Sequence, residues 1–304
     1  TNLADVSTGG DTRRVEGHMI DEFFLRRPYS GDGSYKLADG SVNPNGGPRD
    51  GMIRTKADLD WVAAMLAAGY TFNNNLKQIN SNGSNLWYGD LIMADLNGDG
   101  KYGNDDDREF TGKSSTPKVT LGFNINASWR GFDLNMMWSG RFGGYHYINS
   151  KGANGSMITN TGDALPGDAW NRYYFYDSEA SHAGIIKNEQ GVVIGSSYDP
   201  AADPNARISN EYPRLLTSGG TTPSNTFYLY NTSFVKLKSL QIGYTLPKKW
   251  VAPAKINNLR VFVSGENLLT FKSDRFPGVD PELGGSLAAY PIARMFSGGL
   301  SVTF

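Results

Sequence analysis

The sequence of 304 residues contains no cysteine, which excludes a disulfide framework, a thiolate zinc site and a cysteine nucleophile. No sign of charge dominates, because 29 Lys and Arg stand against 30 Asp and Glu, and a near-neutral chain has no electrostatic footprint for nucleic acid. Hydrophobic residues make up 39% of the chain, too many for a disordered protein, yet no run approaches the roughly 18 apolar residues of a membrane helix. Helical membrane spans are therefore excluded, whereas a β-barrel is not, because its strands alternate in polarity.

The amino end also lacks the features of a signal peptide. From Thr1 to Asp5 it has no basic region, apolar stretch or small-residue cleavage site, so we find no signal peptide there. We expect either a mature chain or one that begins inside a larger protein.

Strict alternation of apolar and polar residues marks the clearest strands. Every second residue from 119 to 129 is apolar, and the pattern resumes over 132–142 after Arg130-Gly131. Such alternation places the two sets on opposite faces of a strand, and a two-residue turn puts Trp129 and Phe132 on the same face. The sequence therefore predicts a β-hairpin with one apolar and one polar face.

The length of these strands favours a membrane barrel. Residues 119–129 match the roughly 9–11 residues that a tilted strand needs to cross a bilayer, whereas soluble strands have about 5–6. The apolar face ends in paired aromatic residues, as at a membrane interface. The other face carries Asn124, Asn126 and Asn135, which suit a wet lumen. A long soluble hairpin with one solvated face would show the same pattern.

Further strands are predicted at 240–246, 259–271 and 296–304. Short connections, at 130–131 and 248–258, contrast with long connections that are rich in Gly, Asn, Ser and Pro. Short turns on one side and long loops on the other are typical of outer-membrane barrels. We therefore predict an all-β fold, in which residues 119–304 form antiparallel strands of a transmembrane β-barrel with long extracellular loops and a periplasmic carboxyl end.

Residues 1–118 alternate less clearly. We expect barrel strand or strands there, one of them within 15–27, together with an extracellular loop region and a short helix. Thr55-x-x-Asp58 resembles a capping box. A helical stripe then follows and ends at Gly69; it consists of Leu59, Val62, Met65 and Leu66. The helix is either a docking element or a short helix that packs on neighbouring loops.

An Asp-rich loop has the spacing of a calcium site. Such a loop supplies side-chain oxygens at positions one, three, five and twelve and a main-chain carbonyl at position seven. In this order, the residues are Asp95, Asn97, Asp99, Asp106 and, for the carbonyl, Lys101. Asp106 is shorter than the usual Glu, and Asp105 or Asp107 could replace it. We predict a structural Ca²⁺ ion; the alternative is a metal-free loop of Asx turns.

One aromatic cluster could stack on a sugar ligand. It lies in the long connection after residue 142 and consists of Trp170, Tyr173, Tyr174 and Tyr176. The alternative is packing within the loop or against a partner. We expect no enzyme, since the chain has neither His-Glu-x-x-His nor Gly-x-Ser-x-Gly, and nothing selects a catalytic pair of carboxylates.

Several motifs follow one another in a fixed order. They are Gly89-Asp90-Leu-Ile before Asp95–Gly100, Pro117-Lys118 before Gly122-Phe123-Asn124, Gly131-Phe132-Asp133-Leu134, Ser233–Leu240, Gly243–Pro247, Val261–Thr270 and Pro277-Gly278-x-Asp280-Pro281-Glu282. As a set, they resemble the SusC/RagA family of TonB-dependent outer-membrane transporters. The resemblance covers about residues 16 to 304.

The last residues resemble the terminal β-signal of barrel proteins, carried here by Gly299, Val302 and Phe304. We therefore expect the true carboxyl terminus. The resemblance implies a 22-strand barrel that is plugged by an amino-terminal domain. Members of the family are several times longer than this chain. The resemblance thus implies the carboxyl-terminal part of a transporter, completed by the remaining barrel and plug.

The family resemblance implies energised import of glycan oligomers or peptides across the bacterial outer membrane. It also implies contact with outer-membrane lipid, a SusD-like surface lipoprotein as a lid, and TonB acting on the plug. The polar strand face would then line the lumen. Two alternatives remain open at this point: a secreted, calcium-stabilised carbohydrate-binding β-sandwich, and a fragment of a glycoside hydrolase.

Overall fold

The computed structural model describes residues 12–13, 15–147, 173–214, 223–274, 276, 280–283 and 292–304. They fall into two compact units that interleave along the sequence. Unit 1 comprises the described parts of 1–18, 22–112 and 148–229, and unit 2 those of 19–21, 113–147 and 230–304. The described residues of the long connection between residues 147 and 230 thus pack with the amino-terminal region.

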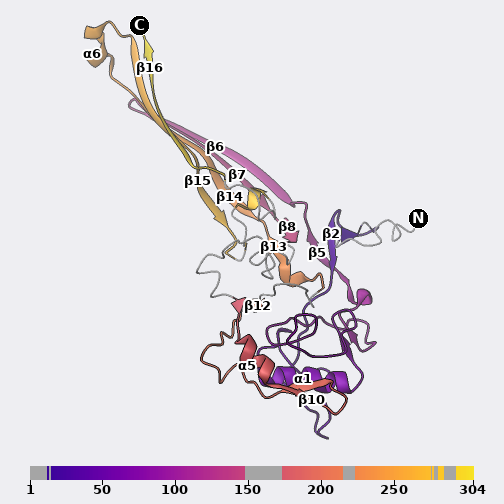
Figure 1. Ribbon diagram of the computed structural model, residues 1–304. Helices are drawn as coiled ribbons and strands as arrows, with labels where there is room; N and C mark the ends of the chain where they lie inside the picture. The colour runs from indigo at the N-terminus through magenta and orange to yellow at the C-terminus, as the bar shows by residue number, and fades with distance from the viewer. Residues whose placement is uncertain are drawn as a thin grey trace. The chain divides into compact units, whose positions relative to one another are not determined.

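Unit 2 is built on one antiparallel sheet of five strands. The strands are β6 (Val119–Trp129), β7 (Phe132–Phe142), β14 (Phe234–Thr245), β15 (Asn258–Lys272) and β16 (Met295–Thr303). Their order in the sheet, β6-β7-β14-β15-β16, is also their order in the sequence. Figure 1 shows them side by side as one twisted ribbon. The predicted strands are confirmed, and β14 begins earlier than expected.

The hairpin between β6 and β7 has the predicted turn. Trp129 pairs with Phe132, and the two turn residues, Arg130 and Gly131, have φ angles of 48° and 91°. Positive φ at both central residues characterises the primed turns whose twist matches that of the flanking strands. Trp129 and Phe132 therefore lie on the same face, as the alternation predicts.

A β-bulge in β14 lies between Leu237 and Ser239, and it interrupts the register with both β7 and β15. Leu237 pairs with Trp138, and Leu240 pairs with Met136, so the two leucines lie on the same face although they are three residues apart. A one-residue change of register moves every later side chain to the other face. The bulge thus keeps Leu240, and with it Ile242 and Tyr244, on the apolar face.

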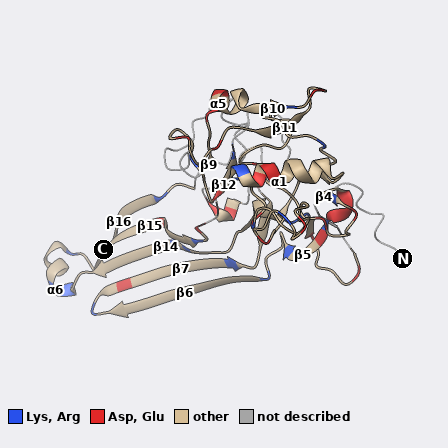
Figure 2. Cartoon of the chain, turned by 90° about the horizontal axis from the view of Figure 1, so that it is seen from below, with Lys and Arg blue, Asp and Glu red and all other residues tan. Residues whose placement is uncertain are grey.

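The five described strands form an open sheet, with β6 and β16 at its edges. No closed barrel is formed by the part of the chain that the structure describes, and the prediction of a 22-strand barrel stays a prediction. Figure 2 shows how sparsely charged residues are distributed along the five strands.

The remaining elements are short. The strands are β1 (Thr12–Arg13), β2 (Glu22–Leu25), β3 (Thr71–Phe72), β4 (Lys101–Tyr102), β5 (Glu109–Ser114), β8 (Tyr145–Tyr147), β9 (Tyr173–Tyr174), β10 (Ile185–Lys187), β11 (Val193–Ser196), β12 (Tyr212–Arg214) and β13 (Leu229–Asn231). The helices are α1 (Lys56–Ala67), α5 (Ser178–Ala183) and α6 (Lys248–Val251), with 3₁₀ turns at Asp105–Asp107, Thr226–Tyr228, Ala252–Ala254 and Pro281–Leu283. Within 15–27, only Glu22–Leu25 is a strand, shorter than predicted.

Helix α1 organises the core of unit 1. Its predicted capping box is present: the Asp58 N–H donates to the Thr55 hydroxyl, and the Thr55 N–H donates to the Asp58 carboxylate at 2.8 Å. Leu59, Val62 and Met65 are fully buried. Around them lie large aromatic residues, including Trp61, Trp87, Tyr88, Phe72 and Tyr174. Among the described residues, no helix is both long enough and apolar enough to cross a membrane.

Candidate functional site

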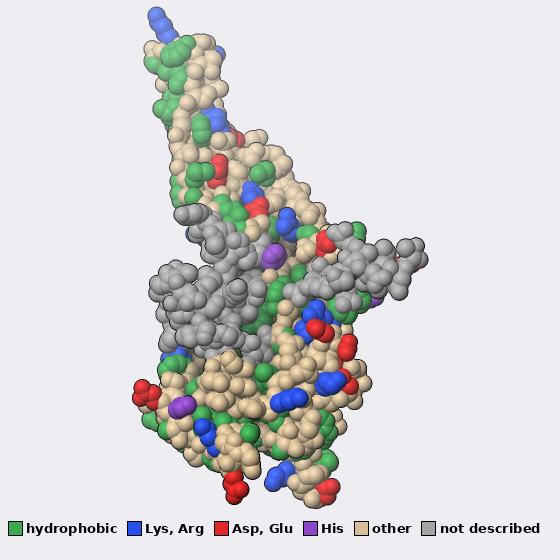
Figure 3. All heavy atoms as spheres, turned by 45° about the vertical axis from the view of Figure 1, so that its right-hand side comes forward, with side chains coloured by type: hydrophobic (Ala, Val, Ile, Leu, Met, Phe, Trp, Pro, Cys, Tyr) green, Lys and Arg blue, Asp and Glu red, His purple; other side chains and the backbone are tan. Residues whose placement is uncertain are grey.

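One face of the five-stranded sheet is apolar from edge to edge. The register aligns one residue from each strand in a row: Trp129, Phe132, Tyr244, Val261 and Leu300. These apolar residues are exposed to an unusual degree, with Trp129 at 67% and Leu300 at 68%. Figure 3 shows hydrophobic side chains on the surface of the described sheet. A continuous apolar surface of this kind marks contact with lipid or with a partner.

The opposite face is polar over the same strands. A second row, again with one residue from each strand, consists of Asn126, Asn135, Gln241, Ser264 and Ser297. The side-chain amide of Asn135 donates to that of Asn126 at 2.6 Å. The two faces therefore differ in chemistry along the whole width of the sheet.

An ion pair crosses the polar face near the short turns. The Nε of Arg260 on β15 donates to Oδ1 of Asp133 on β7 at 2.9 Å, and its Nη2 donates to Gln241 on β14 at 3.3 Å. Gly243 lies between them, and a Cβ there would collide with both charged side chains. The glycine therefore allows an arginine to reach across an intervening strand.

The Asp-rich loop folds tightly on its own backbone. The Asp95 carboxylate accepts hydrogen bonds from the N–H groups of Gly98 and Gly100, at 2.6 and 2.8 Å. The side chains of Asn97 and Asp99 each accept from the N–H two residues further on, both at 2.9 Å. Each of these oxygens keeps a second lone pair. These side-chain oxygens are of the kind that Ca²⁺ prefers as ligands. The Lys101 carbonyl and Asp106 are the other predicted ligands.

Asp106, the ligand predicted at position twelve of the loop, is exposed, whereas its neighbour Asp107 is fully buried. Asp107 accepts from the N–H groups of Leu96, Gly103 and Asn104 at 2.7–3.0 Å. Throughout the described part of the chain, no three His, Asp or Glu side chains converge to hold a metal ion. In this structure, Asp107 thus closes the loop through hydrogen bonds from the loop backbone.

The described tyrosines of the predicted aromatic cluster pack against other aromatic side chains of unit 1. Trp170 lies outside the described residues. Tyr174 is 2% exposed, and Tyr173 stacks on Tyr212 with 5.0 Å between ring centroids. Tyr176 packs edge-on against Tyr88 and Tyr174. The three described rings therefore pack within unit 1, which does not support an open platform for sugars.

A buried ion pair, which the sequence analysis missed, joins distant segments of unit 1. Arg214 donates to both carboxylate oxygens of Asp90 at 2.7 Å and to the Tyr176 hydroxyl at 2.8 Å. Burial alone would lower the pKa of the Arg214 guanidinium, but Asp90 and Tyr176 raise it above its ordinary value. Gly89, with φ at +83°, packs against Arg214 and Tyr174 and leaves no room for a side chain. The Gly89-Asp90 motif is therefore an anchor for the long connection.

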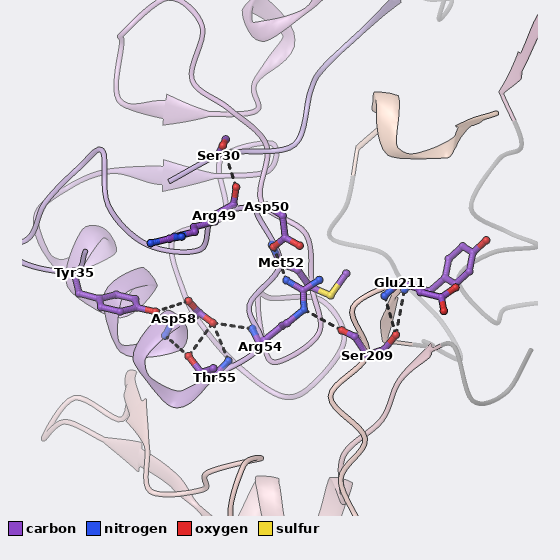
Figure 4. A network of polar contacts seen from close by, with 11 residues as sticks. Ser30, Tyr35, Arg49, Asp50, Met52, Arg54, Thr55, Asp58, Ser209 and Glu211 are labelled. Carbon is purple, nitrogen blue, oxygen red and sulfur yellow. Dashed lines mark hydrogen bonds and ion pairs between the residues drawn. The ribbon is translucent and has the colours of Figure 1, made fainter. Parts of the chain in front are cut away.

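A second polar network, drawn in Figure 4, fixes the start of α1. Asp58 accepts from the N–H groups of Arg54 and Thr55 and from the Tyr35 hydroxyl, which lies 2.9 Å away. The Nε of Arg54 donates to the Ser209 carbonyl at 2.9 Å. The network therefore ties the helix to a segment more than a hundred residues further along the chain. These contacts fix the amino-terminal end of α1 within unit 1.

The residues of the predicted assembly signal lie in or directly after β16. Gly299 faces Phe262, while Val302 and Phe304 are exposed at 41% and 81%. Phe304 follows the last strand residue, Thr303.

Comparison with known proteins agrees with the motifs in the sequence. No family model matches the chain. "TonB-dependent receptor P3" of Formosa agariphila is 27% identical over 237 residues, which are 71% of this chain and 19% of the relative. "TonB-dependent receptor SusC" of Bacteroides thetaiotaomicron is 26% identical over 44% of this chain and 13% of its own length. A solved structure of the RagAB peptide transporter is 22% identical, with 77% of this chain and 22% of that chain covered and a TM-score of 0.47.

The sequence relatives define a class: the chain resembles TonB-dependent receptors. SusC itself is one of the relatives, so the resemblance to receptors of the SusC type is confirmed. The chain spans about a fifth or less of the length of these relatives. The two sequence relatives are TonB-dependent receptors, which fits the expectation of a non-enzyme.

Proposed function

We propose that this chain forms part of the wall of a TonB-dependent outer-membrane transporter. The observation that carries the proposal is the difference between the two faces of the five-stranded sheet, shown by one row of residues on each face. The row from Trp129 to Leu300 is apolar and exposed, whereas the row from Asn126 to Ser297 is polar. A barrel wall requires this division, because one face contacts lipid and the other contacts a water-filled interior.

The strand lengths support the same proposal. The 11 residues of β6 rise about 3.4 Å each, so that at a tilt of about 45° they span about 26 Å. The apolar band of an outer-membrane barrel is about 25 Å tall. In a secreted β-sandwich, by contrast, a second sheet would cover the apolar face.

Because the sequence relatives are TonB-dependent receptors, we further propose the components with which this chain would act. The rest of the barrel and a plug would complete the transporter, TonB would act on the plug, and a SusD-like lipoprotein would form the lid. The cargo would be glycan oligomers or peptides. The long connections would be extracellular, and the carboxyl end of β16 would be periplasmic.

Fractionation and mass analysis of the protein from its native cells test the proposal. We expect the protein in the outer-membrane fraction and soluble only in detergent. We also expect a plug domain with it, either in the same polypeptide or in a second polypeptide that is tightly bound. A species of 33.2 kDa that is soluble without detergent would contradict the transporter and support the secreted carbohydrate-binding sandwich. Deletion of the gene should abolish growth on the imported glycan or peptide but not on its monomers.

We also propose that the Asp-rich loop binds a structural Ca²⁺ ion through Asp95, Asn97, Asp99, Asp106 and the Lys101 carbonyl. The tight bend at Gly100, whose φ is +78°, and the hydrogen bond from its N–H to Asp95 support this loop geometry. Hard oxygen ligands from alternate residues are those that Ca²⁺ prefers. Binding would require Asp106 to turn towards the other ligands.

A further inference from the structure

A lysine is buried on the polar face of the sheet. Lys236 of β14 has a side chain only 1% exposed, and its Nζ lies 2.9 Å from Oε2 of Glu282. It also pairs with Asp280. A buried ammonium group is costly unless carboxylates neutralise it and accept its hydrogen bonds. The position of Lys236 therefore depends on the turn that carries Asp280 and Glu282.

The β-bulge brings a second lysine to the same turn. Lys238 is the extra residue of the bulge, and its Nζ lies 2.6 Å from both carboxylate oxygens of Glu282. Lys236, Lys238, Asp280 and Glu282 thus form a cluster of two cations and two anions, which we call the Lys–Glu cluster.

The turn itself is closed by its own hydrogen bonds. The Asp280 side chain accepts from the Glu282 N–H at 3.0 Å, and the Asp280 carbonyl accepts from the Leu283 N–H at 3.1 Å. Pro281 is buried, as is Phe276 at 3% exposed. Asp280 therefore both shapes the turn and binds it to β14.

We propose that Lys236 and Lys238 are positioning residues that hold the Asp280–Leu283 turn against the polar face of the sheet. The proposal rests on the proposed function for its consequence: in the transporter, this face borders the transport path, so the turn narrows that path. A buried ion pair adds little stability compared with apolar packing, but it fixes one arrangement. Neutralising one partner therefore releases the turn without removing the sheet.

Hydrogen exchange of the Glu282 and Leu283 amides tests the contact directly in the intact protein. Glu282→Gln keeps the shape of the side chain, and we expect it to speed exchange of these amides by about tenfold, since local opening needs less free energy. Lys238→Met should act in the same direction, and the double variant Lys238→Met/Glu282→Gln should exchange within about threefold of Glu282→Gln, because both changes remove the same ion pair. Lys248→Met, an exposed lysine of α6, is the control and should change nothing.

A thiol placed on β7 provides a second readout. Ser139 pairs with Lys236 in the register, and its hydroxyl is buried without a hydrogen-bond partner. Because the chain has no cysteine, Ser139→Cys gives this chain a single thiol, and a maleimide should label it slowly. Adding Glu282→Gln should raise the labelling rate by about tenfold.

Parent-like exchange in Glu282→Gln, or fully additive effects in the Lys238→Met/Glu282→Gln double variant, would overturn the proposal. Both readouts are independent of transport. A protein that carries no cargo but shows non-additive effects of Lys238→Met and Glu282→Gln would refute the proposed function and leave the Lys–Glu cluster established.

Discussion

Arg260 on β15 reaches over Gly243 on β14 and pairs with Asp133 on β7. The pair thus joins two strands that are not neighbours, and it does so on the polar face beside the short turns. Only a residue without a Cβ fits at position 243. The glycine that begins the Gly243–Pro247 motif therefore has a physical reason in this sheet.

Gly243→Ala should break the Arg260–Asp133 pair and lower the melting temperature of the protein in detergent. The control is Gly298→Ala in β16, where the nearest atom to a new Cβ is the Phe262 carbonyl oxygen at 3.8 Å, and it should cause no loss. In an Arg260→Ala background, Gly243→Ala should be nearly neutral, because the two changes remove the same interaction. An undiminished effect in that background would mean that the pair does not explain the glycine.

A positive charge should lower the unfolding free energy much more on the apolar face of the sheet than on the polar face. Val263→Arg places a cation on the apolar face, and we expect a loss of about 2–4 kcal/mol in unfolding free energy in lipid if the site lies near the bilayer midplane. Ser264→Arg, the next residue on the same strand, faces the polar side and should cost much less. Denaturant unfolding in vesicles measures both. Equal losses for the two variants would argue against a lipid-facing sheet.

Breaking the buried Asp90–Arg214 pair from one side should strongly destabilise unit 1. Asp90→Asn leaves the arginine buried without a counter-charge, which costs about 3–5 kcal/mol. The control is Asp60→Asn in the exposed Lys56–Asp60 pair of α1, where we expect a loss of less than about 0.5 kcal/mol. Guanidinium unfolding, followed by tryptophan fluorescence, compares the two. Similar small losses would show that the buried pair is dispensable.

Removal of metal should distinguish Asp106 from Asp107. If Asp106 is a Ca²⁺ ligand, EGTA lowers the melting temperature of the parent, and Asp106→Asn removes that dependence without further loss. Asp107→Asn should destabilise the protein with or without Ca²⁺, since it weakens acceptance from three backbone N–H groups. A melting temperature that does not respond to EGTA or to added Ca²⁺ would exclude the proposed ion.

Tyr102 should make unit 1 sensitive to alkali. Burial, together with the nearby charges of Asp95 and Tyr70, raises the pKa of the Tyr102 hydroxyl to about 12. An unfolded tyrosine has a pKa of about 10, so the folded state holds its proton more tightly, and the stability this provides is complete below pH about 10. It should be lost as the pH rises from about 10 to about 12. Absorbance titration with Tyr102→Phe as the reference measures it; a Tyr102 transition at about pH 10 would contradict the burial effect.

The sequence predicted most of the sheet and little of the site. The strict alternation around Arg130-Gly131 predicted the hairpin, its turn and its two faces, all of which the structure confirms. The capping box at Thr55 and Asp58 likewise predicted the start of α1. These are local signals, since they depend on neighbours within a few residues.

The contacts that fix the site are not local. Asp90 and Arg214 are separated by 124 positions, and Lys236 and Glu282 by 46. A charged residue inside an apolar or alternating segment is a signal that a partner exists, but it does not reveal which residue that partner is. The sequence also left open whether the tyrosines of the aromatic cluster are exposed or buried, because the same residue types occur in both positions.

By itself, the sequence determined the strands, their faces and the resemblance to SusC-type receptors, because alternation and motif order are properties of the chain. Only the tertiary structure decided the bulge at Lys238, the reach of Arg260 over Gly243 and the choice of Asp107 as the residue that closes the acidic loop. Each of these depends on the register between strands or on burial of a charge. Both are set when distant segments pack together.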